Sequence, residues 1–250
     1  MYRELTLGDR HRAFRYKNNV QLISRFLYPE DSTEDGRRLR LMQEYFMVSA
    51  GLQSIVRHYK RKYKESMYKF DQYIAIHIND THPALVVPEL MRILLDEEGM
   101  AWEDAWDITC RTVAYTNHTI LPEAMEKWSI PMFQSLLPRI YLIVEEINNR
   151  WLKEVRRLYP GDENKARSVA ILWDGQVHMA HLSVLGSHSV NGVAEIHSQI
   201  LKDSTLHQST RFSRTVSPTR PTALRTAAGL SKPIRSCRTS STKRSATHGS

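Results

Sequence analysis

The sequence lacks a long apolar run. No stretch approaches the roughly 20 residues of a transmembrane helix, and the first four residues lack the charged-then-apolar order that begins a signal peptide. We therefore expect a cytoplasmic protein. Its 250 residues, 41% apolar and 25% charged, are ordinary for a soluble globular chain that buries a sizeable core in one or two domains.

Cysteine and recognisable catalytic motifs are also scarce. Cys110 and Cys237 lie far apart without metal-type or redox-type spacing, so we expect two free thiols. The chain contains no Gly-Xaa-Ser-Xaa-Gly nucleophile elbow, no P-loop and no dinucleotide glycine fingerprint. The enzyme classes that these motifs mark are therefore not indicated.

Acidic residues are missing from one end of the chain. Residues 208–250 contain nine Lys or Arg and no Asp or Glu, whereas residues 1–207 carry 26 basic and 27 acidic side chains. The net charge of +8 therefore belongs to this segment, and nucleic-acid binding would rest on it alone. Because it is rich in Ser, Thr, Arg and Pro and has no apolar periodicity, we predict a disordered tail over 208–250 and a folded unit over 1–207.

The first part of the chain predicts helices followed by a buried strand. A helix is expected over residues 12–27, and Asp35 is expected to cap a long second helix with apolar residues at helical spacing. The basic end of that helix, residues 57–64, fits either a solvated helix end or an anion site. The alternating run Tyr73–Ile78 then predicts a strand that ends in polar residues.

The rest of the chain predicts an α/β fold. Helices are expected from Pro83 to about Leu95, from Trp102 to Ala114 and from Leu136 to Tyr159. Asp174-Gly175 between two apolar runs predicts a type I′ hairpin, and a last helix is expected from Val190 to Leu201. We predict a partial Rossmann-like domain with long helices around a short, mostly parallel sheet.

Polar residues after the Tyr73–Ile78 strand mark the expected ligand site, since strands of an α/β sheet deliver side chains to its mouth. His77 and His82 flank Asp80, but alternation sends His77 and Asp80 to opposite faces, so no metal site is expected. A second pair, His178 and His181, is expected to be ordinary polar surface.

Two further stretches are candidates. Glu123 and Glu126 would share a helix face as a carboxylate pair, although a solvated first helical turn explains them equally well. Small and polar residues from Gly186 to Val193 would lead into the last helix, so their backbone N–H groups could face an anion or a sugar.

Nine stretches together closely resemble the glycogen (α-1,4-glucan) phosphorylase family, in order and at family spacing, from about Asp9 to His207. They are Leu27–Asp31, Leu39–Phe46, Asn79–Pro83, Pro88–Leu94, Ala105–Asp107, Tyr115–Thr119, Leu121–Ala124, Leu136–Arg139 and Gly186–Val193.

The resemblance implies a fold and a reaction. Family members are homodimers whose two Rossmann-like domains face a deep cleft, and they cleave α-1,4-glucan with inorganic phosphate to give glucose 1-phosphate. Their pyridoxal phosphate is a Schiff base on a lysine of the carboxy-terminal domain, and its phosphate takes part in proton transfer. This chain resembles the later part of the amino-terminal domain alone.

Site residues follow by resemblance only. His118 matches the residue that contacts the glucosyl unit beside the scissile bond, and we expect it to be catalytic. Arg57 matches an effector-phosphate contact, although His58 stands where the family has a second arginine. The expected substrate-binding residues are Asp31 in the loop that gates the cleft, Asp80 and His82 in its wall, Glu123, Ala124 and Glu126 in the adjoining loop, and Val193 near the sugar and cofactor.

Other family parts have no match in this sequence. The glycine-rich phosphate loop and the cofactor lysine segment are not recognisable, so we expect this chain to bind no pyridoxal phosphate and to be inactive alone. The expectation is either a piece of a glucan phosphorylase or a non-catalytic remnant that at most binds glucan or associates with itself. A one-base shift of codons for a family segment reads as Ser217 to Ala223, which predicts a frame slip near Gln208.

Overall fold

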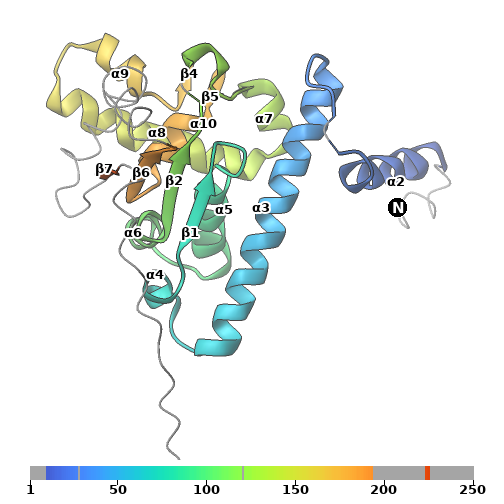
Figure 1. Cartoon of the computed structure of the whole chain (residues 1–250), viewed down its shortest axis with the longest axis horizontal. Coiled ribbons are helices and arrows are strands. Elements are labelled where there is room, and N and C mark those ends of the chain that lie inside the picture. The colour runs from blue at the N-terminus through green and yellow to red at the C-terminus, as the bar shows by residue number, and fades with distance from the viewer. Residues whose placement is uncertain (1–9, 28, 120, 194–222, 226–250) are drawn as a thin grey trace, which may run out of the picture.

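Helices surround a small parallel sheet in the computed structural model of the chain (Figure 1). The structure describes residues 10–27, 29–119, 121–193 and 223–225. It confirms the predicted α/β class with a short parallel sheet. The predicted disordered tail lies outside the described residues except for Ala223–Arg225, which form the short strand β7.

The longest element is α3, Glu34–Tyr63, whose buried side chains recur at helical spacing. Its N-cap is Thr33, whose Oγ1 accepts a hydrogen bond from Gly36 N at 3.1 Å. The prediction that Asp35 caps this helix was therefore wrong, because Asp35 already lies in the first turn. Gly36 is required there, since a Cβ would lie 1.6 Å from the carbonyl oxygen of Glu30.

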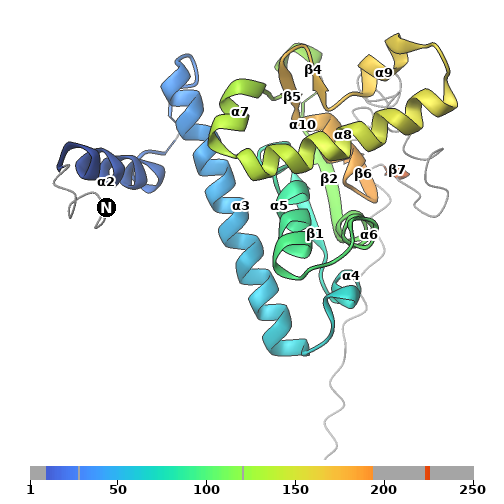
Figure 2. The same ribbon diagram turned by 180° about the vertical axis from the view of Figure 1, so that it is seen from behind.

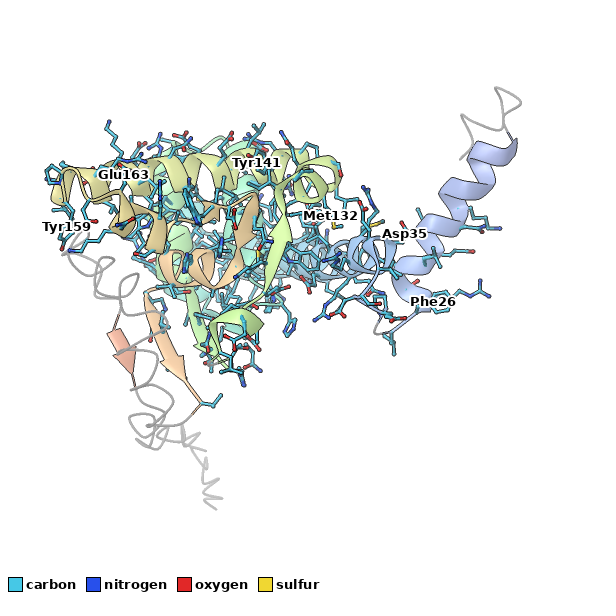
Figure 3. The ribbon with its side chains drawn as sticks, turned by 90° about the horizontal axis from the view of Figure 1, so that it is seen from above. Phe26, Asp35, Met132, Tyr141, Tyr159 and Glu163 are labelled. Atoms are coloured by element: carbon cyan, nitrogen blue, oxygen red, sulfur yellow. The ribbon has the colours of Figure 1, made fainter. Side chains whose placement is uncertain are left out.

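The preceding helix, α2 (Arg10–Arg25), projects from the body near the amino end of α3 (Figures 1 and 2). Gln43 joins the two helices, because its side-chain amide donates to the carbonyl oxygens of Ile23 at 3.1 Å and Phe26 at 2.6 Å. Figure 3 shows Phe26 and Asp35 at this end of the molecule, away from Tyr159 and Glu163 at the other. The helix predicted over residues 12–27 is confirmed, and it begins and ends two residues earlier than predicted.

The parallel sheet has the order β1-β2-β6-β7, with β1 at Ile76–Asn79, β2 at Val113–Asn117 and β6 at Ser189–Gly192. Ile78, Tyr115 and Val190 align across these strands and are buried on one face. The helix predicted from Trp102 to Ala114 is confirmed as α6 (Trp102–Thr112), which ends two residues earlier. The prediction that Val190 opens a helix was wrong, because Val190 belongs to β6. The remainder of that expected helix, residues 194–201, lies outside the described part.

Helices α5 (Val86–Arg92) and α8 (Pro138–Leu158) form the layer behind the sheet, as Figure 2 shows. α5 packs against α3, α6 and α8, and its predicted start at Pro83 moves to Val86 after a turn. The short elements of this half are η1 (Met67–Lys69), α4 (Phe70–Tyr73), the π-helical η2 (Ile93–Glu97) and α7 (Ile130–Leu136).

A buried carboxylate fixes α3 against α5. Glu89 is fully buried and accepts hydrogen bonds from Tyr45 Oη at 2.9 Å and Ser49 Oγ at 2.8 Å, both on α3. Arg92 donates to both carboxylate oxygens of Glu89 at 2.9 Å. Burial, with the nearby charge of Glu89, raises the pKa of Tyr45 to about 12. The network therefore sets the position of α3, which carries part of the cavity described below.

A second, antiparallel sheet has the order β3-β5-β4, formed by Lys127–Ser129, Gln176–His178 and Leu172–Trp173. The hairpin between β4 and β5 confirms the prediction, since Asp174 and Gly175 have φ of 51° and 68° as a type I′ turn requires. The helices around it are α9 (Glu163–Val169) and α10 (Met179–Leu185).

The pair His178 and His181 was expected to be ordinary polar surface, and this prediction was wrong. His181 is half-buried in α10, its Nδ1–H donates to the carbonyl oxygen of Ala170 at 2.7 Å, and its ring stacks on His178 at 5.4 Å. Burial lowers the pKa of His181 to about 4. The pair therefore joins α10 to the chain before β4 in the neutral state.

Candidate functional site

The carboxyl ends of β1 and β2 bring two polar segments together. Asp80 follows β1 and His118 follows β2, and the Asp80 N–H donates to the carbonyl oxygen of Thr116 at 2.8 Å. Asp80 has a φ of 65°, and its Oδ1 accepts a hydrogen bond from the Thr81 N–H at 2.8 Å. This left-handed turn directs the chain away from the sheet at the edge where α/β folds bind ligands.

A cavity of about 430 Å³ opens beside this edge. Its wall combines residues from the loop before α3, from α3 itself, from the turn after β1 and from the segment that leads into β3. The lining residues are Asp31, Arg37, Arg40, Asp80, Thr81, His82, Thr119, Ala124, Glu126, Lys127 and Trp128.

Five of the expected site residues line this cavity, and four do not. Asp31, Asp80, His82, Ala124 and Glu126 are in its wall. The four outside the wall are His118, Glu123, Val193 and Arg57.

His118 lies next to the cavity at the same end of the sheet. Its side chain is exposed, and its Nε2 is 2.5 Å from Oδ1 of Asn79. Because a carbonyl oxygen only accepts, His118 donates from Nε2, and in the neutral ring Nδ1 is left as an acceptor. The neighbouring strand ends therefore orient this imidazole.

A hydrogen-bonded row crosses the sheet just below these ends. His77 Nε2 lies 2.5 Å from Thr116 Oγ1, which donates to Asn191 Oδ1 at 2.9 Å. On the opposite face, the buried Asn117 donates to Tyr115 Oη at 2.7 Å. These contacts fix the strand ends on both faces of the sheet, so the positions of the site residues are set by the backbone of three strands.

Opposite charges are balanced around the cavity. Asp31 and Arg40 form an ion pair at 2.9 Å, and Arg40 Nε lies 3.5 Å from Glu44 Oε1. Asp31, Asp80 and Glu126 supply carboxylates, while Arg37, Arg40 and Lys127 supply cations. Such a wall can hydrogen-bond several hydroxyl groups and also attract an anion.

Arg57 is remote from this cavity. It is exposed on α3 about 35 Å along the helix from Glu34, whereas Asp31 precedes the first turn. The effector role and the solvated-helix-end interpretation of Arg57 both stay predictions.

Two expected local geometries differ from the structure. Glu123 lies in the short 3₁₀ turn η3 (Pro122–Ala124) and Glu126 follows it, so the two carboxylates share no helix face. Ser189–Gly192 pair with β2 as a strand, so these residues do not form the helix start that would face an anion or a sugar. Val193 follows that strand and is exposed.

Sequence reasoning missed the basic residues of the wall. Arg37 and Arg40 sit at helical spacing just after the Asp31 loop, which places both near the same end of α3. That spacing was a usable signal. Lys127 and Trp128 were missed because their place in the cavity wall depends on the pairing of β3 with β5, which lies much later in the chain.

Metal and membrane features can be stated for the described residues. Within residues 10–27, 29–119, 121–193 and 223–225, no group of three or more His, Cys, Asp or Glu side chains is placed to hold a metal ion. In that same part of the chain, no helix has the length and apolar character to cross a membrane.

Comparison of the sequence with those of known proteins identifies the family of the chain. The sequence model of the family described as "Carbohydrate phosphorylase" matches residues 2–220. The chain belongs to the carbohydrate phosphorylase family. This confirms the resemblance carried by the motifs around Asp80 and His118.

Individual relatives are similar over most of this chain. Glycogen phosphorylase of Bacillus subtilis (strain 168) is 56% identical over 188 residues, which cover 75% of this chain and 23% of that protein. The brain form of Rattus norvegicus is 47% identical over 212 residues, covering 81% and 25%. The muscle form of Homo sapiens is 46% identical over 210 residues, covering 80% and 25%. This phosphorylase chain thus spans about a quarter of the length of the relatives it matches.

Proposed function

We propose that residues 1–207 form the later part of the amino-terminal domain of an α-1,4-glucan phosphorylase, and that the cavity is one wall of its glucosyl site. The family reaction is phosphorolysis of α-1,4-glucan to glucose 1-phosphate. The observation that supports the proposal is the convergence of Asp31, Asp80, His82 and Glu126 on one cavity beside His118.

The proposed role of these residues is to hold a glucosyl ring. Carboxylates such as Asp31 and Asp80 accept hydrogen bonds from sugar hydroxyls, and charge-assisted bonds of this kind are stronger than neutral ones. His118 would accept through Nδ1, since its Nε2–H is held by Asn79. Hydrogen bonds that strengthen as the ring flattens toward an oxocarbenium-like transition state lower the barrier to glycosyl transfer.

The loop before α3, which we propose as the gating loop, is held against that helix. Asp31 is exposed and is joined to Arg40 on α3, while Gly36 allows the backbone of Glu30 to approach the first turn. We propose that glucan and phosphate are the ligands of this cleft and that Asp31 orders its entrance. The roles of Glu123, Ala124 and Val193 stay predictions.

The described residues do not fit pyridoxal phosphate. The cofactor needs a lysine amine enclosed in a pocket to form a Schiff base. Among the described residues no lysine is buried, and the one in the cavity wall, Lys127, is exposed. Pyridoxal phosphate therefore belongs to our proposal for a full-length phosphorylase, and none of the steps assigned to this chain depends on it.

Assembly as a homodimer is also proposed from the family. Helix α2 packs on α3 and projects from the body (Figures 1 and 2). A projecting helix is suited to contact a second subunit. A cytoplasmic location likewise stays a prediction.

The second candidate function is a non-catalytic remnant that at most binds glucan or associates with itself. The observation that favours it is the absence of an enclosed lysine in the described part. Whether the gene continues downstream into a domain with the cofactor lysine discriminates the two candidates.

A chimera tests the proposed function. Residues 9–207 would replace the matching stretch of Bacillus subtilis glycogen phosphorylase, which is 56% identical to this chain. Formation of glucose 1-phosphate from glycogen and phosphate by the purified chimera is the expected result. A folded chimera that binds pyridoxal phosphate but forms no product would overturn the proposal.

A further inference from the structure

Two carboxyl groups, those of Glu44 and Glu126, interact side chain to side chain at the cavity wall. Glu44 comes from α3 and Glu126 from the residue before β3. The Glu44 side chain is only 10% exposed. All four carboxyl oxygens are buried, and none has a hydrogen-bond partner among the described residues.

This pair cannot carry two full negative charges without a large cost. Buried carboxylates that share a site repel each other and lose hydration, so one of them keeps its proton. Burial in the first place, and then the negative charge of Glu126, raise the pKa of Glu44 to about 9. The burial of all four oxygens without another hydrogen-bond partner agrees with this outcome, because a shared proton satisfies one oxygen of each residue.

The other charged and titratable groups around the pair do not replace this proton. Arg40, on α3, lies 3.5 Å from Glu44 and lowers its pKa, but it is also paired with Asp31 at 2.9 Å. From β2, Tyr115 faces Glu126, and Tyr115 Oη already accepts a hydrogen bond from Asn117. Arg40 thus offsets the negative charge of the pair only in part, because its own charge is divided between Asp31 and Glu44.

We propose that Glu44 is a positioning residue that stays protonated at neutral pH, donates its O–H to the carboxylate of Glu126, and so fixes Glu126 in the cavity wall. This role goes beyond the residues that the family resemblance assigned. Its consequence for substrate binding rests on the proposed function, whereas the shared proton itself does not.

The shared proton also sets the charge of the cavity. With Glu44 neutral, the three wall carboxylates face the three wall cations Arg37, Arg40 and Lys127. An ionised Glu44 would add a fourth negative charge next to Glu126. Because the proposed substrates include phosphate and its sugar ester, an added negative charge there would repel them.

The test is a titration of the full 250-residue chain labelled with ¹³C at the glutamate side-chain carboxyls, followed by nuclear magnetic resonance. We expect one resonance of a protonated carboxyl at neutral pH that titrates near pH 9, while exposed glutamates titrate near their ordinary pKa of 4.5. This resonance should be absent in Glu44→Gln, titrate at lower pH in Glu126→Gln, and be unchanged in Glu34→Gln, an exposed residue of the same helix.

A pair of variants separates positioning from mere folding. Glu44→Gln keeps an N–H donor, so the Glu126 carboxyl resonance should stay close to its position in the unmodified chain. Glu44→Ala removes the donor, so that resonance should move toward those of exposed glutamates. If Glu44→Ala does not fold, the unmodified chain and Glu126→Gln still decide the matter.

Titration of Glu44 in the ordinary carboxyl range, or a Glu44 pKa that does not change in Glu126→Gln, would overturn the proposal. The measurement requires neither glucan nor cofactor. Its failure is therefore distinguishable from failure of the chimera to form glucose 1-phosphate.

Discussion

Asn79 ends β1 and His118 directly follows the neighbouring parallel strand β2, and the side-chain amide oxygen of Asn79 accepts the Nε2–H of His118 at 2.5 Å. The two residues are 39 positions apart in the sequence. Their contact depends on the register of β1 against β2, which pairs Asn79 with Thr116. The register of β1 against β2 therefore determines the orientation of the candidate catalytic residue His118.

Two glycines of α3 should respond in opposite directions to replacement by alanine. Gly36→Ala would place a Cβ 1.6 Å from the carbonyl oxygen of Glu30, and relieving this clash should cost on the order of 1–3 kcal/mol. Gly51→Ala meets nothing within 4 Å and should stabilise the helix by about 0.5–1 kcal/mol. Urea unfolding measures both, and equal stability of the two variants would contradict the packing of the Asp31 loop on α3.

Glu44→Gln should flatten the pH dependence of stability. The folded-state pKa of Glu44 is raised from 4.5 to about 9, so its stabilisation is complete below about pH 4.5 and is lost as the pH rises toward 9. The slope in the unmodified chain should exceed that of the variant by at most about 1.4 kcal/mol per pH unit. Urea unfolding at a series of pH values measures this difference.

Two controls isolate the contribution of Glu44. Because the pKa of His181 is lowered from 6.5 to about 4 in the folded chain, His181 raises the free energy of unfolding as the pH rises from about 4 to 6.5. This contribution is the same in both chains and cancels in the difference between them. Glu34→Gln should follow the unmodified chain. Parallel curves for Glu44→Gln and the unmodified chain would rule out a buried proton at Glu44.

The 250-residue chain should form no specific adduct with pyridoxal phosphate. Lysines of the described part are exposed or half-exposed, and none is enclosed as a Schiff base requires. Incubation, borohydride reduction and peptide mapping should give at most scattered labelling of surface lysines. Stoichiometric labelling of one lysine would contradict this expectation.

The fold could be predicted from the sequence where local chemistry decides it. Asp174-Gly175 specifies its turn without any distant partner, and the helical pattern of α3 is continuous. The strand β6 could not be predicted in this way. Val190 is buried because it packs beside Tyr115, which lies far earlier in the chain, whereas the glycine and serine residues around it suggested a turn and a helix start.

The candidate site also could be predicted from the sequence only in part. The polar residues Asp80 and His82 could be placed at a strand end from the sequence, since the apolar run before them stops abruptly. Glu44 could not, because it reads as an ordinary polar position on a helix. Its importance arises from its interaction with Glu126, which lies 82 positions later in the chain and reaches α3 only in the folded protein.

A reading-frame change near Gln208 is a further prediction, because codons for a family segment shifted by one base read as Ser217 to Ala223. Resequencing the gene across this junction should restore an Asn-Lys-Thr-Asn-Gly segment and a downstream domain. The match to the family model continues to residue 220, past the proposed slip. A confirmed junction with no phosphorylase sequence in any frame would instead support an independent basic tail.

The most direct test of the account is His118→Ala in the chimera with Bacillus subtilis glycogen phosphorylase, with His58→Ala, exposed on α3, as the matched control. Loss of one transition-state hydrogen bond should cost about 2–4 kcal/mol, so we predict a fall in glucose 1-phosphate turnover of roughly 30-fold or more, with assembly unchanged. The control should retain its turnover. Unchanged turnover in His118→Ala would contradict the assignment of this strand end as the glucosyl site.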